Sequence, residues 1–270
     1  MIKSALRYPG GKSRLVERIS ELAPKDFKEY REPFVGGGSV FIRIMQDYPN
    51  RLYWINDLYY DLYCFWNWCQ INPDEVLKEV ERIRNEWGTD GKGMHRYLVD
   101  NIAGMTDIQK AAAFFVLNRI TFSGTSLSGG YSEGAFNNRF TDSSIDRMMD
   151  VGKFLKEHPL TITNLDFSEV LKGGNKDTFT FLDPPYYTAT NSALYGKNGE
   201  LHKGFDHERL AECLKGCEHR WLMTYDDCDY VRGLYKDFNI KEFKLMYGMK
   251  NVNKGTDMNG SEIFISNYEI

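Results

Sequence analysis

At 270 residues, with 42% hydrophobic and 27% charged side chains, the chain can bury one large α/β domain, and its composition excludes an intrinsically disordered protein. No apolar run approaches the roughly 20 residues that span a bilayer, and the start MIKSALRYPGGK lacks the apolar centre of a signal peptide, so we expect a cytoplasmic protein without a membrane partner. The formal net charge of -4 argues weakly against nucleic acid, but basic residues gather near the start of the chain, either as a binding surface or as a solvated face.

The first part of the chain predicts a strand, turn, helix, strand unit. After the Gly10-Gly11 turn, apolar residues recur at helical spacing from Leu15 to Leu22, and Pro24 ends this helix. The expected elements that follow are a strand from Tyr30 to Val35, a helix from Val40 to Met45 and a strand from Leu52 to Ile55. With a glycine-rich turn between the first two, this order is typical of a βαβ unit.

The middle of the chain has a different character. Helical patterns over 74–87, 93–102, 107–122 and 143–157 have no strands between them, which predicts a helical insert over residues 67–154. Within it, residues 122–141 are rich in Gly, Ser and Asn and are interpreted as a long irregular loop, of the kind that is usually functional or disordered.

The last part returns to alternating strands and helices. Strands are expected at Leu160 to Thr163, Thr178 to Leu182 and Trp221 to Thr224, followed by an antiparallel hairpin of 239–247 with 262–268. Residues 1–66 and 155–270 together therefore predict an α/β domain with a mostly parallel sheet and a C-terminal antiparallel hairpin.

Two glycine-rich turns each suggest an anionic or nucleotide-like ligand. The end of RYPGGKS matches the end of a phosphate-binding P-loop, but Leu6 stands where that motif needs its first glycine. We therefore interpret the segment as a turn whose N–H groups and Lys12 suit an anion, or simply as the start of a helix. EPFVGGGSVF follows a strand, and Asp57 at the tip of the next strand is placed to bind ribose hydroxyls. Because the third glycine of a dinucleotide fingerprint is replaced by Phe41, a dehydrogenase is disfavoured.

The stretch FLDPPYY offers hydrogen-bond acceptors beside aromatic rings. Asp183 follows an apolar strand, and the two prolines after it have no N–H to compete for the local carbonyls. Such a site suits an amino group on a flat ring, whose two hydrogens bind Asp183 and the Pro184 carbonyl while Tyr186 stacks on the ring. Accepting both hydrogens directs the nitrogen lone pair at an electrophile; a structural turn is the alternative. The histidines and cysteines lack metal-ligand spacing, so no metal is predicted.

Taken in order, these motifs resemble those of the Dam-type, or D12-class, N6-adenine DNA methyltransferases. RYPGGK is similar to the family's amino-terminal cofactor motif, EPFVGGGSVF to its glycine-rich motif, WIND to its acidic strand tip and DPPY to its catalytic tetrapeptide. LNRITFSG and EGAFNNRF resemble the helix end and loop that approach DNA in the target-recognition subdomain. The similarity extends over nearly the whole chain.

The resemblance implies a Rossmann-like fold, S-adenosylmethionine as methyl donor, and an adenine flipped out of double-stranded DNA as acceptor. It implies Asp183, Pro184 and Tyr186 as catalytic residues, and Asp166 and Phe167 for the adenine of the cofactor, although Phe167 also suits a plain core position. The full set that it implies for cofactor binding is Tyr8, Gly11, Lys12, Phe34, Gly36, Gly38, Ser39, Asp57, Asp166, Phe167 and Asp183.

For DNA, the resemblance implies Phe122 as the wedge that fills the gap left by the flipped base, unless it is a core residue that ends a helix. Family members that read GATC carry Asn and Arg where this chain has Ser123 and Leu127, and leucine cannot bind guanine as arginine does, so GATC is not predicted. Arg119 and Arg139 are candidate phosphate or base contacts, with surface salt bridges as the alternative.

Two other functions stay open at this point. The same chemistry suits another acceptor, such as the cytosine amino group, adenine in RNA or a glutamine amide, although relatives with those substrates more often carry Ser or Asn in place of Asp183. The second alternative is a protein that binds nucleic acid but does not catalyse methyl transfer. The intact DPPY motif, Lys12 and Asp57 argue against it. We expect the protein to act as a monomer.

Overall fold

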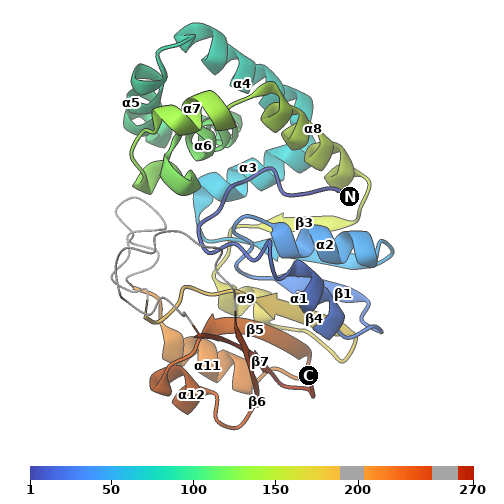
Figure 1. Cartoon of the computed structure of the whole chain (residues 1–270). Helices are drawn as coiled ribbons and strands as arrows, with labels where there is room; N and C mark the ends of the chain where they lie inside the picture. Colours follow the sequence, from blue (N-terminus) through green and yellow to red (C-terminus); the bar gives the residue numbers. More distant parts are fainter. Residues whose placement is uncertain (189–203, 245–260) are drawn as a thin grey trace.

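A computed structural model describes residues 1–188, 204–244 and 261–270. Its centre is a sheet of seven strands in the order β3-β2-β1-β4-β5-β7-β6 (Figure 1). The strands are β1 (Glu29–Glu32), β2 (Leu52–Asn56), β3 (Leu160–Thr163), β4 (Thr178–Leu182), β5 (Arg220–Asp226), β6 (Asn239–Lys244) and β7 (Ser261–Ser266).

The first five strands of this order are parallel, and β7 pairs antiparallel with β5 and β6. The mostly parallel sheet and its antiparallel C-terminal strands are thereby confirmed, although residues 245–247 of the predicted hairpin lie outside the described residues. The chain passes from β1 to β2 and β3 on one side and then returns to β4 on the other side of β1, so the strand order reverses direction there. Open α/β sheets place ligands outside the carboxyl ends of strands at such a switch point.

Helices cover both faces of the sheet. Along β4, β5 and β7, Phe179, Phe181, Leu222 and Phe264 enter one hydrophobic cluster, while Leu182, Met223, Ile263 and Ile265 enter the other, as the two-residue period of a strand requires. The first cluster includes residues of α1 (Val16–Leu22) and α2 (Ser39–Asp47). The second includes residues of α9 (Phe167–Leu171), α11 (His207–Lys215) and α12 (Asp229–Leu234).

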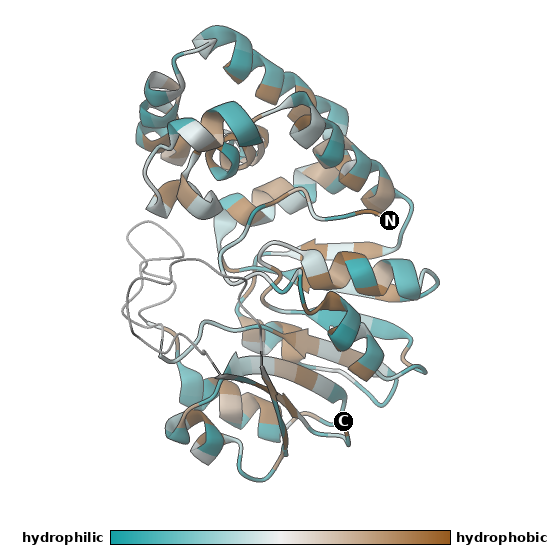
Figure 2. Ribbon diagram, in the orientation of Figure 1, coloured by the Kyte–Doolittle hydropathy of each residue, from teal (hydrophilic) through white to brown (hydrophobic). Residues whose placement is uncertain are grey.

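The remaining helices form the upper part of Figure 1. They are α3 (Tyr60–Ile71), α4 (Pro73–Trp87), α5 (Gly91–Asn101), α6 (Asp107–Ile120), α7 (Glu133–Arg139) and α8 (Asp142–Lys156). In Figure 2 their apolar residues lie mainly on the inner sides and their polar residues on the outer sides. At the centre is α6, which is buried from Ala111 to Ile120. No helix in the described part of the chain is both long and apolar enough to cross a bilayer.

Some predicted elements need correction. Strand β1 ends at Glu32, earlier than expected, because Pro33 has no N–H to continue the ladder. Helix α3 was not predicted: it is apolar on nearly all sides and therefore shows no amphipathic period. It runs without interruption through the boundary expected after residue 66, and it contacts α6, α8 and β3.

The loop expected over 122–141 also contains more structure than its composition indicates. Two short 3-10 turns, Phe122–Gly124 and Ser126–Ser128, follow α6. Helix α7 then begins after Ser132, whose hydroxyl caps it by accepting a hydrogen bond from Ala135 N–H at 3.2 Å. A good cap and the burial of Ala135 therefore outweigh the low helix propensity of the Gly and Asn residues in this stretch.

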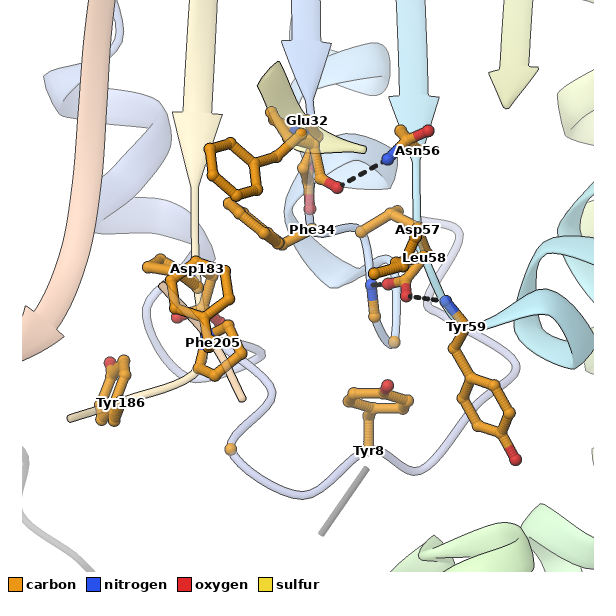
Figure 3. A pocket seen from close by; sticks show the side chains of 18 of the residues that line it. Tyr8, Glu32, Phe34, Asn56, Asp57, Leu58, Tyr59, Asp183, Tyr186 and Phe205 are labelled. Atoms are coloured by element: carbon orange, nitrogen blue, oxygen red, sulfur yellow. Dashed lines mark hydrogen bonds between the residues drawn. The ribbon is translucent and has the colours of Figure 1, made fainter. Parts of the chain in front are cut away.

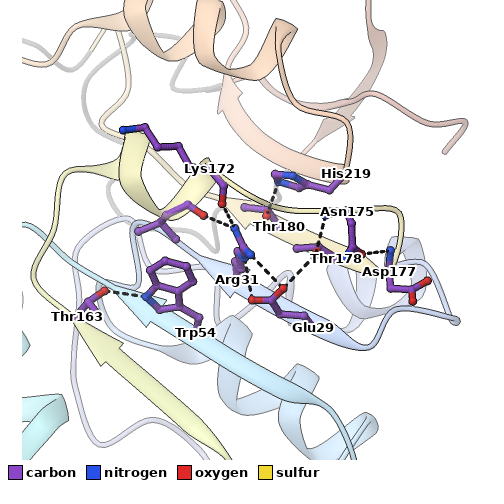
Figure 4. A network of polar contacts seen from close by, with 11 residues as sticks. Glu29, Arg31, Trp54, Thr163, Lys172, Asn175, Asp177, Thr178, Thr180 and His219 are labelled. Carbon is purple, nitrogen blue, oxygen red and sulfur yellow. Dashed lines mark hydrogen bonds and ion pairs between the residues drawn. The ribbon is translucent and has the colours of Figure 1, made fainter.

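A buried polar network ties β1 to its neighbours (Figure 4). The Arg31 guanidinium binds both carboxylate oxygens of Glu29, at 3.0 and 3.1 Å, and donates to the carbonyls of Val170 and Lys172 at 2.8 and 2.7 Å. It also lies 5.0 Å from the centre of the Trp54 ring. Arg31 is one of the basic residues near the start of the chain. Because it is buried and makes these contacts, its role is structural and it is not part of a surface that could bind nucleic acid.

Candidate active site

A cavity of about 500 Å³ lies at the carboxyl ends of β1, β2 and β4 (Figure 3). This is the volume of a small-molecule site rather than of a packing defect. Every residue predicted for catalysis or cofactor binding lines it: Tyr8, Gly11, Lys12, Phe34, Gly36, Gly38, Ser39, Asp57, Asp166, Phe167, Asp183, Pro184 and Tyr186. The structure thus gathers these residues from five separate parts of the chain.

The glycine-rich turn after β1 is shaped by the protein's own aromatic rings. Gly36 and Gly38 have φ of 46° and 69°, which side chains rarely adopt. A Cβ on Gly37 would lie 2.6 Å from Cβ of Tyr8, and a Cβ on Gly38 would lie 2.5 Å from the Trp66 ring. The turn therefore needs glycine because the side chains of Tyr8 and Trp66 pack directly against its backbone. The sequence had suggested a different reason, the close approach of a ligand to this backbone.

The carboxylate of Asp57 holds the same turn. It accepts hydrogen bonds from Gly36 N–H at 2.9 Å and from Tyr59 N–H at 3.0 Å, one on each oxygen. Burial raises the pKa of Asp57 to about 6, although these hydrogen bonds oppose the rise. Because each carboxylate oxygen has two lone pairs, both can still accept from a ligand hydroxyl in the cavity.

Glu32 is a cavity residue that the sequence analysis missed. Located at the end of β1, it is almost fully buried and accepts a hydrogen bond from the Tyr30 hydroxyl. Burial raises its pKa well above the ordinary range, and the nearby carboxylates of Asp183 and Asp57 raise it further. The one available signal was a charged residue directly before Pro33 at the end of a strand.

An aromatic wall closes one side of the cavity. The rings of Phe34, Phe167 and Phe205 lie 5.6 to 5.7 Å apart, centre to centre, in tilted and edge-on arrangements. Asp166 next to them accepts hydrogen bonds from Ser168 and from Arg209. Burial by itself would raise the pKa of Asp166, but the hydrogen bonds from Ser168 and Arg209 lower it. The net effect is a lowered pKa, so Asp166 is ionised. Phe167 both lines the cavity and packs in the second hydrophobic cluster, and its contact with the cofactor stays a prediction.

Lys12 reaches the cavity from the first glycine turn. Gly11 N–H donates to the Tyr8 carbonyl at 3.0 Å, and the Lys12 ammonium donates to the Gly10 carbonyl at 2.9 Å. The turn does not open directly into a helix, because α1 begins only at Val16. Lys12 Nζ lies 2.8 Å from Oδ1 of Asp183, and its side chain is almost completely buried.

Asp183 at the tip of β4 therefore has a defined orientation. Its Oδ1 receives the Lys12 ammonium and, at 2.8 Å, the hydroxyl of the buried Thr224 on β5. Both contacts reach the same oxygen, and among the described residues the other oxygen has no hydrogen-bond partner, so it can accept from a donor that enters the cavity. The Thr224 contact was not predicted, because the two residues are 41 positions apart in the chain.

Tyr186 is held on several sides. Its hydroxyl donates to Oε2 of Glu262 at 2.9 Å, one face stacks near Tyr225 with centres 5.8 Å apart, and Lys12 Nζ lies 4.8 Å from the ring centre. Burial, with the charges of Asp183 and Glu262, raises the pKa of Tyr186 far above its usual value. Tyr186 is thus a neutral, oriented ring at the edge of the cavity.

The residues predicted to contact DNA lie outside this cavity. Phe122, directly after α6, is 67% exposed, so it is not a core residue. Ser123 is exposed too and has a left-handed φ of 52°. The exposed ring is accessible to a ligand outside the protein, and its role as a wedge stays a prediction.

Four arginines gather near this turn: Arg7, Arg119, Arg139 and Arg147. Arg139 and Arg147 are exposed, whereas Arg119 is only 4% exposed, with its guanidinium 5.5 Å from the Phe115 ring. In this conformation Arg119 therefore cannot contact DNA directly. Burial, with the charges of the other three arginines, lowers the pKa of Arg119 to about 10. None of the four forms an ion pair with an acid among the described residues.

Comparison with known proteins identifies relatives over most of the chain. The family model described as D12 class N6 adenine-specific DNA methyltransferase matches residues 8–249. Type II methyltransferase M1.LlaDCHI of Lactococcus lactis subsp. cremoris is 25% identical, over 97% of this chain and 94% of its own length. Type II methyltransferase M.MjaIII of Methanocaldococcus jannaschii is 26% identical, over 89% and 90%. A DNA adenine methylase of Vibrio cholerae is 26% identical, over 90% and 88%.

Proposed function

Since the chain belongs to the D12 class of N6 adenine-specific DNA methyltransferases, we propose that Asp183, Pro184 and Tyr186 hold the adenine amino group that receives the methyl group. The observation that supports this assignment is the fixed orientation of Asp183, whose Oδ1 is bound by Lys12 and Thr224 beside the cavity. The free oxygen of Asp183 and the Pro184 carbonyl accept the two amino hydrogens. This draws the nitrogen lone pair out of conjugation with the ring, and the face of Tyr186 supports the base.

We assign the cavity to S-adenosylmethionine. This donor carries positive charges on sulfur and on its amino group against one negative carboxylate. Even without Glu32, whose raised pKa favours its neutral form, acidic residues outnumber basic ones in the lining: Asp57, Asp166, Asp183, Asp206, Asp226 and Glu262 against Lys12 and Arg209. Asp57 is placed for the ribose hydroxyls, and the wall of Phe34, Phe167 and Phe205 for the adenine ring. When bound, S-adenosylmethionine supplies an electrophilic methyl carbon.

Double-stranded DNA with a flipped adenine is the proposed substrate. The amino group of a stacked, paired adenine cannot reach Asp183, and the exposed ring of Phe122 suits the gap that a flipped base leaves. Phosphate groups would neutralise Arg7, Arg139 and Arg147, none of which forms an ion pair in the described part of the chain and whose charges act on the buried Arg119. We assign DNA recognition to the helical part, residues 67–154, and the chemistry to 1–66 and 155–270. Since one chain carries both parts, a monomer suffices.

The test is methyl incorporation into duplex DNA from tritiated S-adenosylmethionine, with the modified nucleoside identified by mass spectrometry. Wild type should form N6-methyladenine, and Asp183→Ala should lower the rate at least about 10³-fold. Asp177→Asn is the matched control, because this carboxylate lies just before the other end of β4 and pairs with Lys28 on the surface. N4-methylcytosine as product, methylation of RNA alone, or full activity of Asp183→Ala would reject the proposal.

A further inference from the structure

One buried side chain joins the loop that leads into the cavity to the turn that carries Phe122. Asn118 on α6 is fully buried, and its Oδ1 accepts from Arg7 N–H at 2.9 Å. Its Nδ2 donates to the Arg7 carbonyl at 2.6 Å and to the Gly124 carbonyl at 2.9 Å. The amide therefore pairs with the backbone of Arg7 on both sides, as a neighbouring strand would, and also holds Gly124.

The two loops are also in direct contact. Gly124 has φ of 76°, and a Cβ at this position would lie 2.3 Å from the Arg7 carbonyl oxygen. The residue after Arg7 is Tyr8, whose ring packs against Gly36 and Gly37 in the turn of the cavity. A displacement of either loop therefore reaches the other through closely packed atoms.

We propose that Asn118 is a positioning residue that couples the cavity to the Phe122 turn, so that a ligand in the cavity strengthens binding of the duplex and the duplex strengthens binding of the ligand. The contacts concerned are buried, and three hydrogen bonds on one amide leave little freedom for the two loops to move separately. Coupling of this kind is reciprocal: each ligand must change the affinity of the other by the same factor. The inference rests on the proposed function, because it takes DNA and methyl donor as the two ligands.

Gly124→Ala tests the contact, and Gly130→Ala is the matched control. Both glycines lie in the same loop, but a Cβ on Gly130 meets no atom within 4 Å. The measurement is the Kd of a duplex that carries the sequence methylated by wild type, with and without sinefungin, a non-reactive analogue of the donor. We expect sinefungin to lower the Kd at least about 5-fold for wild type and Gly130→Ala, and less than about 2-fold for Gly124→Ala.

A second variant reaches the same contact from the other side. Asn118→Asp keeps an acceptor for Arg7 N–H and loses both donated hydrogen bonds, so it too should reduce the ratio of the two Kd values to less than about 2. A merely structural role would weaken binding in both conditions and leave the ratio unchanged. The reverse titration, sinefungin with and without duplex, must give the same factor.

The outcomes separate this inference from the proposed function. If wild type methylates DNA but shows no coupling, or if Gly124→Ala and Asn118→Asp keep the wild-type ratio, Asn118 does not couple the two ligands although the enzyme assignment stands. If wild type forms no N6-methyladenine, the proposed function itself fails. Should Gly124→Ala not fold, as judged by its thermal unfolding, Asn118→Asp decides.

Discussion

Lys12 Nζ and Asp183 Oδ1 lie 2.8 Å apart, which joins the first glycine turn of the chain to the tip of β4, 171 positions later. The lysine is almost completely buried and Asp183 is only partly exposed, so this ion pair is less screened by water than those on the surface. The same ammonium lies 4.8 Å from the Tyr186 ring centre. One cation thus orients both side chains proposed to hold the target base.

Lys12→Met should lower the rate of methyl transfer at least about 10²-fold, because it removes the cation that orients Asp183 and leaves this carboxylate without its ion pair. The control is Lys28→Met, which breaks an ion pair with Asp177 that lies on the surface. Steady-state rates on duplex DNA and thermal unfolding of both variants provide the measurement. A Lys12→Met enzyme within 3-fold of wild type, roughly 0.7 kcal/mol in the barrier, would contradict this role.

Thr224→Val should lower kcat/KM about 5- to 30-fold, because valine keeps the shape of threonine and loses the hydroxyl that donates to Asp183 Oδ1. Thr224→Ser keeps the hydroxyl and should stay within about 3-fold of wild type. If the valine variant stays within about 3-fold of wild type while the serine variant loses activity, the volume of the side chain matters here and the hydrogen bond to Asp183 does not.

Phe122→Ala should weaken methylation at least about 10-fold while changing the free energy of unfolding by less than about 0.5 kcal/mol, because the ring is exposed and packs little against the protein. Fluorescence of 2-aminopurine at the target position reports base flipping directly and should fall with the rate. Leu52→Ala, which removes another exposed apolar side chain at the start of β2 and outside the cavity lining, is the control. Equal effects of the two substitutions would argue against a wedge.

His219 should make the protein less stable in mild acid. The ring is buried with Nε2 3.0 Å from the Thr180 hydroxyl (Figure 4), and burial, with the charge of Arg31, lowers its pKa to about 4. The unfolded value is about 6.5, so between pH 4 and 6.5 the unfolded state binds more protons. The free energy of unfolding therefore rises with pH in this window, by at most about 1.4 kcal/mol per pH unit from this group.

Urea unfolding at pH 5 and pH 7 checks this contribution. His219→Gln removes the titrating group, so the loss of stability on acidification should be smaller in the variant than in wild type. Carboxylates that titrate in the same range act in both proteins and cancel in the comparison. An identical pH dependence of the two proteins would show that His219 is not protonated on unfolding.

Local sequence was sufficient for the elements whose signals are local. The strands at Leu160–Thr163 and Thr178–Leu182 were predicted with their observed bounds, because each is a short apolar or β-branched run between turn residues. Helix α3 escaped prediction because burial on nearly all sides erases the amphipathic period. Helix α7 escaped because its stability comes from the Ser132 cap and from packing, which composition does not show.

The sequence by itself determined that the motif residues line one cavity, since each motif follows a strand or turn and parallel strands bring their carboxyl ends to one edge, although it did not indicate Glu32 or Phe205. Only the tertiary structure decided how those residues are held. The ion pair of Lys12 with Asp183, the hydrogen bond of Thr224 to Asp183, the burial of Arg119 and the Asn118 bridge join positions far apart in the chain or depend on packing from several elements. The spacing of residues within a motif predicts the local structure around that motif, whereas contacts between segments far apart in the sequence form only when the chain folds.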